Sequence, residues 1–196
     1  NINADVAIRK KFLAKAAKSL DYLDLLVRDL LTISQMESGE IKMKMEPFDV
    51  ISLVKETADQ LEPIAHNRGI KLNFDFGINK SIIVVADYYR IFQVLKNLII
   101  NSIKYSDPNT EIILICEKRK KVVNLGIIDS GKGIPKNHRK RIFERFYRID
   151  KSRGQNKSGV GLGLSIANDI IRSHGGDISL AKSPLNGLRV KVSLPL

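Results

Sequence analysis

Two asparagines and a lysine recur at helical spacing in the segment NLIINSIKYS, residues 97–106. Asn97, Asn101 and Lys104 occupy positions i, i+4 and i+7, so a helix would carry two amides and an ammonium group on one face. A buried amide without a partner costs roughly 1–3 kcal/mol, so these amides need compensation beside the apolar residues of the same helix. Either the neighbouring backbone and solvent supply it, or this face binds a polar ligand.

A carboxylate and two glycines follow the apolar run VVNLGII at 122–128. The next residues are DSGKGIP, in which Asp129 comes directly after the predicted strand and precedes Gly131 and Gly133. Glycines at this spacing admit positive φ and let a ligand approach the main chain, while the carboxylate can accept a bond from the amino group of a base. A tight surface turn is the alternative interpretation.

A second glycine cluster, SGVGLGLSIAN at 158–168, places Gly159, Gly161 and Gly163 before an amphipathic helical pattern. Free N–H groups at a helix N-terminus form an anion site. The spacing resembles a dinucleotide fingerprint, but polar and basic residues precede it where a strand would be required. Ten basic residues crowd into 132–157 among glycines, which indicates either a loop built around polyphosphate or a solvated basic face.

Aromatic residues lie between the two glycine clusters, in the segment IFERFYRID at 142–150. Phe143, Phe146 and Tyr147 alternate with basic residues. The expected structure is a small helix that packs these aromatic rings, at least in part, on the core.

The elements that would position these residues follow from the apolar patterns. A long helix is predicted over about 5–37, with a seam from Leu13 to Leu30 that needs a partner helix. Beyond residue 45 the predicted elements are a strand near Phe48, helices at 50–66, 87–106 and 161–173, and strands at 70–76, 82–86, 111–118, 121–129, 176–182 and 187–194. This order predicts an α+β fold, a two-layer α/β sandwich with helices on one face of a mixed sheet of about five strands.

Composition limits the class of protein. The 196 residues are 43% hydrophobic and 28% charged, which is typical of a globular protein with one or two domains. Apolar runs are shorter than the roughly 18–20 residues of a membrane span, and the segment NINADVAIRKK at 1–11 is not expected to be a signal peptide. The lone Cys116 is predicted to be a core thiol in a reducing compartment. The formal charge of +12 favours an anionic partner.

The combination of NLIINSIKYS, DSGKGIP, IFERFYR and GVGLGLSIAN resembles the N, G1, F and G2 boxes of bacterial sensor histidine kinases, members of the GHKL ATP-binding superfamily. The resemblance implies a Bergerat-type catalytic ATP-binding domain at 45–196. It also implies that 1–44 is a partial dimerisation and phosphotransfer domain, because LVRDLLTISQMESGE at 26–40 is similar to its second helix and linker.

The resemblance also implies a role for each matched residue. Asn101 would hold Mg²⁺ against the triphosphate with Asn97 in support, Lys104 would meet phosphate oxygens, and Tyr105 would border the base. Asp129 would bond the adenine amino group, and Gly131 and Gly133 would let the nucleotide approach. Gly159, Gly161 and Gly163 would surround the phosphates at the hinge of a lid spanning about 132–160. Arg148 would contact the γ-phosphate and stabilise charge during transfer.

The sequence departs from the family at the phosphoacceptor histidine. His66, His138 and His174 all fall in the predicted ATP-binding domain, and each is expected to be structural or solvent-exposed. The expectation is therefore a fragment that binds ATP without phosphorylating itself. The full-length protein would dimerise through its phosphotransfer helices, transfer phosphate to a response-regulator receiver domain, and be anchored in the cell membrane with this part in the cytoplasm.

Three alternative functions fit the sequence less well. An ATPase or chaperone of the superfamily would carry a glutamate where Asn97 stands, and an amide cannot act as a general base. A basic nucleic-acid-binding domain explains the charge and the aromatic residues but not the order of the glycines and asparagines. A degenerate scaffold without ATP binding conflicts with the presence of Asn101 and Asp129.

Overall fold

The computed structural model describes residues 2–37, 43–149 and 160–196. The chain divides into two units, Asn1–Lys42 and Met43–Leu196. The second unit contains every described residue that the sequence assigns to the functional site.

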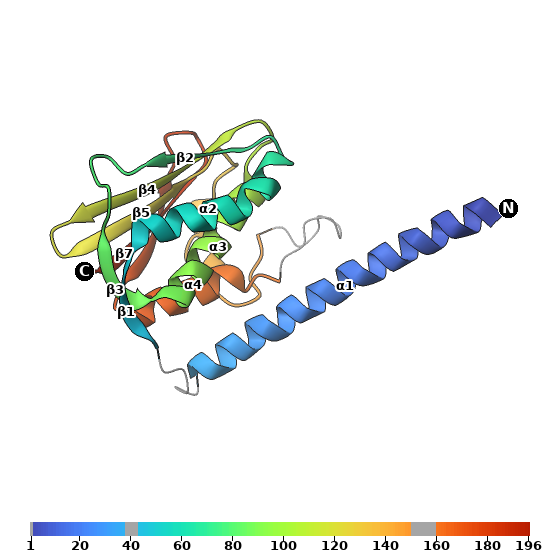
Figure 1. The fold of residues 1–196 in the computed structure, drawn as a ribbon, viewed down its shortest axis with the longest axis horizontal. Helices are drawn as coiled ribbons and strands as arrows, with labels where there is room; N and C mark the ends of the chain where they lie inside the picture. The colour runs from blue at the N-terminus through green and yellow to red at the C-terminus, as the bar shows by residue number, and fades with distance from the viewer. Residues whose placement is uncertain (1, 38–42, 150–159) are drawn as a thin grey trace. The chain divides into compact units, whose positions relative to one another are not determined.

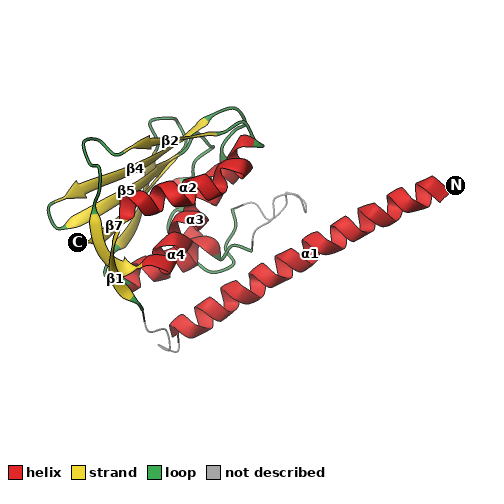
Figure 2. Cartoon of the chain, viewed as in Figure 1, coloured by secondary structure: helices red, strands yellow, loops and turns green. Residues whose placement is uncertain are grey.

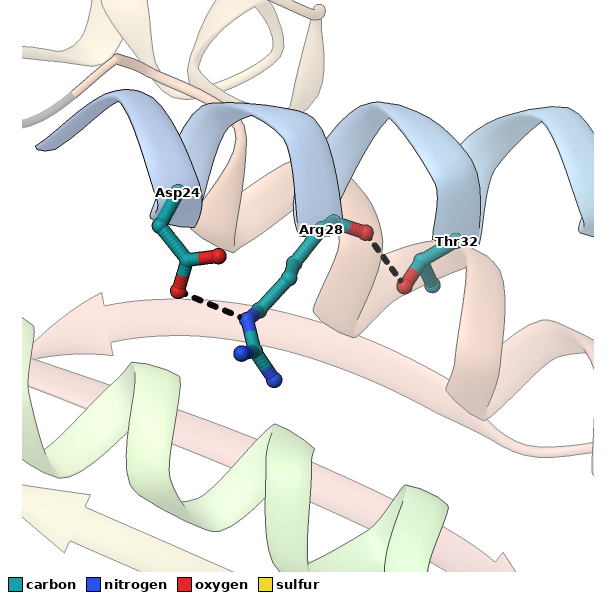
Figure 3. A network of polar contacts seen from close by, with 3 residues as sticks. All are labelled: Asp24, Arg28 and Thr32. Atoms are coloured by element: carbon teal, nitrogen blue, oxygen red, sulfur yellow. Dashed lines mark hydrogen bonds and ion pairs between the residues drawn. The ribbon is translucent and has the colours of Figure 1, made fainter. Parts of the chain in front are cut away.

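The first unit is built on one helix, α1 (Ile2–Glu37), which confirms the predicted long helix. Its apolar seam is exposed: seven large side chains have between 46% and 69% of their surface accessible, namely Phe12, Leu13, Leu20, Leu23, Val27, Leu30 and Leu31. Two polar bonds at i, i+4 spacing lie along the helix surface. Arg28 Nε donates to Asp24 Oδ2 at 2.8 Å, and Thr32 Oγ1 donates to the Arg28 carbonyl at 2.9 Å (Figure 3). No helix in the described ranges is both long and apolar enough to cross a membrane.

The second unit is a two-layer α/β arrangement. Its elements are β1 (Met45–Asp49), α2 (Val50–His66), β2 (Lys71–Asp75), β3 (Ile83–Asp87), α3 (Tyr88–Tyr105), β4 (Glu111–Arg119), β5 (Val122–Ile128), the 3₁₀ turns η1 (Lys136–His138) and η2 (Arg141–Phe143), α4 (Gly163–Ser173), β6 (Asp177–Lys182) and β7 (Leu188–Pro195). Helices α2, α3 and α4 lie on one face of the main sheet (Figures 1 and 2).

The main sheet has five strands in the order β2-β4-β5-β7-β6. It is mixed, because β2 pairs with β4 in parallel while the other neighbours are antiparallel. Strands β1 and β3 form a separate antiparallel ribbon. The predicted mixed five-stranded fold with helices on one face is confirmed, and the sequence patterns gave no sign that two strands would leave the main sheet.

Alternation along the strands explains the core. In β4 the side chains of Ile112, Leu114 and Cys116 are almost fully buried, and the intervening residues are only partly buried. Cys116 is therefore a core thiol, as predicted, and burial raises its pKa to about 12.

Two aspartates begin the helices that follow β1 and β3. Asp49 accepts a bond from the Ile51 N–H at 3.2 Å, and Asp87 accepts one from the Arg90 N–H at 3.1 Å, as N-cap residues do. Helix α3 packs against both α2 and α4, so its position relative to the sheet is determined from both sides. That helix carries the asparagines and lysine singled out in the sequence.

Candidate functional site

Asp129 lies directly after the last residue of β5, with only 4% of its surface exposed. Its Oδ1 atom accepts bonds from two main-chain N–H groups, of Gly131 at 3.0 Å and of Leu188 at 2.8 Å. Its Oδ2 atom accepts a longer bond, 3.3 Å, from the Ser102 hydroxyl. Burial raises the pKa of Asp129 above its usual range, against the opposing effect of these hydrogen bonds. The carboxylate is held rigidly by Oδ1, and Oδ2 keeps lone-pair capacity for a further donor.

Glycines allow three chain segments to meet around this carboxylate. A Cβ atom added at Gly131 would lie 2.6 Å from the Tyr105 carbonyl oxygen, and one at Gly187 would lie 2.3 Å from the Asp129 carbonyl oxygen. Gly133 has a φ of +67°, which favours glycine. The close approach of main chain to main chain therefore depends on Gly131 and Gly187, and the sequence patterns place Gly187 only at the start of the predicted strand 187–194.

The two asparagines on the polar face of α3 have different environments. Asn97 Nδ2 donates to the Gly163 carbonyl at 3.2 Å, so this amide joins the middle of α3 to the start of α4. Asn101 is half-buried, and its amide makes no hydrogen bond within the described residues. An unpaired, partly buried amide on this face fits a site that a ligand or a cation completes.

Two cations lie near each other at the end of this face. The pKa of Lys104 is lowered from its ordinary value, first by burial and then by the positive charge of Arg148. The Lys104 ammonium also lies 5.1 Å from the ring centroid of Tyr105, whose surface is 51% exposed. Lys104 and Arg148 thus bring two positive charges to this end of the face.

Phe146 and Tyr147 contact Gly161, the second glycine of the second glycine cluster. The Phe146 N–H donates to the Gly161 carbonyl at 3.1 Å. Gly161 has a φ of +83°, and an added Cβ there would lie 2.9 Å from the Tyr147 carbonyl oxygen. Gly161 therefore has both a conformational and a steric requirement for glycine. Gly159 lies outside the described residues, as do positions 150–158 of the predicted lid.

The prediction that a small helix packs three aromatic rings on the core is wrong for Phe146. The segment makes only the 3₁₀ turn η2, and Ile142 is the residue that it buries, with 5% exposed. Phe146 is 57% exposed and has a φ of +62°, a conformation that no helix contains. The segment therefore buries the Ile142 side chain and leaves the Phe146 ring exposed.

Tyr147 is held among polar neighbours instead of on the core. Its hydroxyl hydrogen-bonds to His138 Nδ1, and the Arg141 guanidinium lies 4.4 Å from its ring centroid. A hollow of about 350 Å³ lies over this segment, lined by residue 141 and residues 144–149. Among the predicted site residues, Arg148 alone lines it.

The three histidines take the structural or exposed positions expected of them. His66 is exposed at the end of α2, and His138 contacts Tyr147. His174 is buried; its Nδ1 bonds the Ile170 carbonyl at 2.8 Å, and its Nε2 accepts the Asp87 N–H at 3.0 Å. The His174 ring therefore joins the end of α4 to the end of β3.

Sequence reasoning missed several residues that build this site. Ser102 and Leu188 bond Asp129, and Arg68 donates from its guanidinium to the carbonyls of Ile103 and Ser106, the second at 3.0 Å. Arg68 thereby satisfies carbonyls at the C-terminus of α3, where a positive charge is stabilising. A serine on the buried face of a helix was the only local signal for Ser102, and none existed for Arg68.

Comparison with known proteins identifies the family. The sequence model described as "Histidine kinase-, DNA gyrase B-, and HSP90-like ATPase" matches residues 86–196, which is more than half of the chain and includes every residue of the site described above except Arg68. The chain belongs to this ATPase family. The match to the family model begins at residue 86, at the end of β3. The structural unit begins earlier, at Met43, and also includes β1 and α2.

Similar proteins of known name include histidine kinases. The chain is 34% identical over 191 residues to the signal transduction histidine-protein kinase BaeS of Escherichia coli (strain K12), a match covering 95% of this chain and 40% of BaeS. The catalytic domain of histidine kinase ThkA superposes with a TM-score of 0.70 at 30% identity, over 78% of this chain and 96% of that one. Full-length ShkA, solved in complex with AMPPNP, gives a TM-score of 0.79 at 27% identity, over 91% and 36% of the two chains. The chain thus spans less than half the length of BaeS.

Proposed function

We propose that residues 45–196 are the catalytic part of a two-component sensor histidine kinase. They bind ATP with Mg²⁺ and transfer its γ-phosphate to a histidine that lies outside this chain, for relay to a response-regulator aspartate. Membership of the ATPase family and the likeness to BaeS and ThkA support this proposal. Residues 1–44 are then the second helix and linker of the dimerisation and phosphotransfer domain.

The adenine end of the proposed site is organised by Asp129. Its Oδ2 atom accepts the exocyclic amino group of adenine, while the main chain of Gly131 and Gly133 lies against the base. The fixed orientation of Oδ1 supports this assignment, since two N–H donors leave the carboxylate little freedom to turn away. Tyr105, exposed beside Lys104, borders the base.

The phosphate end lies along α3 and the second glycine cluster. Asn101 would supply an amide oxygen to Mg²⁺, an ion that prefers oxygen ligands and is usually held together with substrate phosphates. The half-buried Asn101 amide, which makes no hydrogen bond within the described residues, supports this role. Lys104, Gly159, Gly161 and Gly163 meet the phosphates, and Mg²⁺ bound there would neutralise their charge during transfer.

Transfer is favoured over hydrolysis because of Asn97. An amide cannot take a proton from water, and its Nδ2 is already engaged by the Gly163 carbonyl. Its contribution is to hold the start of α4, and so the phosphate-binding glycines, against α3. Arg148 contacts the γ-phosphate and stabilises the charge that develops on it.

The remaining assignments concern the longer protein. The exposed apolar seam of α1 supports a homodimer formed through the phosphotransfer helices. A receiver domain of a response regulator is the second protein partner. The catalytic part is cytoplasmic, and the full-length protein is anchored in the cell membrane.

The buried, rigidly held carboxylate of Asp129 is the observation that carries this proposal. Calorimetry should detect binding of Mg·ADP and Mg·ATP in the micromolar range, about −7 to −8 kcal/mol. With labelled ATP the chain should not label itself, but it should label a separately supplied helix carrying an acceptor histidine. Absence of both heat and thermal shift with Mg·ATP would refute the proposal, and stable self-labelling would refute the assignment of the three histidines.

A further inference from the structure

A groove of about 550 Å³ crosses the face of the main sheet that lies away from α2, α3 and α4. Alternate residues of three neighbouring strands, β4, β5 and β7, line it. The strand register places their side chains on one face: Gly126 of β5 lies opposite Ile115 of β4 on one side and opposite Lys191 of β7 on the other. The groove is therefore a feature of the sheet surface, separate from the predicted nucleotide site.

Gly126 lies at the bottom of the groove, where the lack of a side chain leaves space. A Cβ atom added there would lie 3.1 Å from Ile115 Cβ, closer than ordinary packing allows. The isoleucine thus leans over the glycine and provides an apolar patch at the bottom. A glycine inside a strand normally lowers the stability of the strand. Such a glycine often marks a place where a ligand or another main chain approaches closely.

The polar side chains of the groove leave an excess of positive charge. Glu117 and Arg119 form an ion pair of 2.7 Å and largely cancel. Asn124 accepts a bond from the Ser193 hydroxyl at 2.8 Å. Across the described ranges, Arg189 and Lys191 make no ion pair, although both are half-buried. Two cations on one face of β7 that form no ion pair within the described residues favour a ligand that brings carboxylates.

We propose that this groove binds an extended acidic peptide segment of a partner protein, with its carboxylates on Arg189 and Lys191. The two cations are separated by one residue along β7 and so face the same side, which matches acidic residues at alternate positions of an extended chain. The Asn124 amide and the Ser193 hydroxyl can meet the main-chain groups of such a segment.

Other anionic partners fit the groove less well. Single-stranded nucleic acid is bound through stacking on aromatic rings, and none of the lining residues is aromatic. A membrane surface is bound through exposed large apolar side chains beside basic ones, and neither Ile115 nor Val122 belongs to the exposed large apolar residues.

The test uses a dye-labelled peptide of alternating glutamate and threonine, with fluorescence anisotropy as the readout. A peptide of alternating glutamine and threonine is the neutral control. The intact chain should bind the acidic peptide and not the neutral one, more weakly as ionic strength rises. The double variant Arg189→Gln/Lys191→Gln should weaken binding at least about fivefold, since two partly screened ion pairs are lost.

Control variants separate the groove from net charge and from folding. Lys10→Gln/Lys15→Gln removes the same charge from exposed positions on α1 and should change binding less than about twofold. Gly126→Ala keeps every charge but raises the floor, and it should weaken the acidic peptide. Thermal melting must show that each variant folds.

Equal weakening by the two double variants, or undiminished binding to Arg189→Gln/Lys191→Gln, would overturn the proposal. Tighter binding of oligothymidylate or of phosphatidylserine vesicles, lost in that same variant, would overturn the choice of a peptide. The proposal does not depend on the kinase assignment, because every readout is independent of nucleotide.

Discussion

Replacing Asp129 by asparagine should separate ligand recognition from folding at a single atom. The asparagine Oδ1 can still accept the bonds from the N–H groups of Gly131 and Leu188, so the loop keeps its two main-chain bonds. Only the Oδ2 position changes, from an acceptor to an NH₂ donor. The Ser102 hydroxyl, which donates to Oδ2 at 3.3 Å, can rotate to accept instead.

The lost interaction is the bond to the adenine amino group. Hydrogen bonds to charged groups contribute about 1.5–3 kcal/mol, so Asp129→Asn should weaken ADP binding about 10- to 150-fold. Guanine presents a carbonyl in place of the amino group, so the new NH₂ should not weaken GDP. Isothermal calorimetry with both nucleotides measures the difference. Equal losses for ADP and GDP would refute the role given to Asp129.

The same variant should fold at least as stably as the parent. Burial raises the pKa of Asp129 in the folded state, so the folded chain binds a proton more readily than the unfolded chain does. The contribution of Asp129 to the free energy of unfolding therefore falls as pH rises from its unfolded pKa, about 4, to the raised folded value, and stays low above it. At neutral pH the charge costs stability, and asparagine removes that cost.

Melting curves measured between acid and neutral pH test this sign. Asp129→Asn should melt no lower than the parent at neutral pH, and it should lack the fall in stability assigned to Asp129. Asp177→Asn is the matched control, because this carboxylate is 62% exposed and pairs with Arg172 at 3.5 Å. A variant that melts well below the parent at neutral pH, with Asp177→Asn unchanged, would contradict the reasoning about burial.

Three further predictions concern the supports of the site. Gly187→Ala should destabilise the fold by about 1–3 kcal/mol, because its Cβ would overlap the main chain of Asp129, and denaturant unfolding measures this. Lys104→Met should weaken ATP while leaving adenosine unchanged, without lowering the melting temperature, because burial and the charge of Arg148 already disfavour the ammonium. Arg68→Gln should cost about 2 kcal/mol through the carbonyls it leaves at the end of α3, lowering the melting temperature by roughly 4–8 °C.

The glycine and arginine variants each have a control within the chain. Gly77→Ala is the control for Gly187→Ala with respect to space, since a Cβ at Gly77 would meet no atom within 4 Å, although its φ of +54° adds strain of its own. Arg172→Gln removes an arginine with 66% exposure and should change stability by less than about 0.5 kcal/mol. If Arg172→Gln and Arg68→Gln melt alike, the helix-capping role of Arg68 is wrong.

The order of helices and strands followed from local patterns. Alternating burial in β4 and helical spacing in α3 are read directly from residue types, because each period follows from backbone geometry. The same patterns carried no information on which strands pair, so the separate ribbon of β1 and β3 came only from the structure. The exposure of Phe146 also came only from the structure, because helical spacing does not predict its φ of +62°.

Residue types and their spacing are enough to name the chemical groups of the site: Asn97, Asn101 and Lys104 on one helical face, Asp129 after a strand, and glycines at fixed spacing. The way these residues are held depends on contacts between distant segments. Ser102, Leu188 and Gly187 contact Asp129 from segments far away along the chain. Arg68, just after α2, donates to carbonyls at the C-terminal end of α3. Such partners come together only when the sheet and helices pack, because a hydrogen bond or a close approach depends on distance in space and leaves no periodic signal in the sequence.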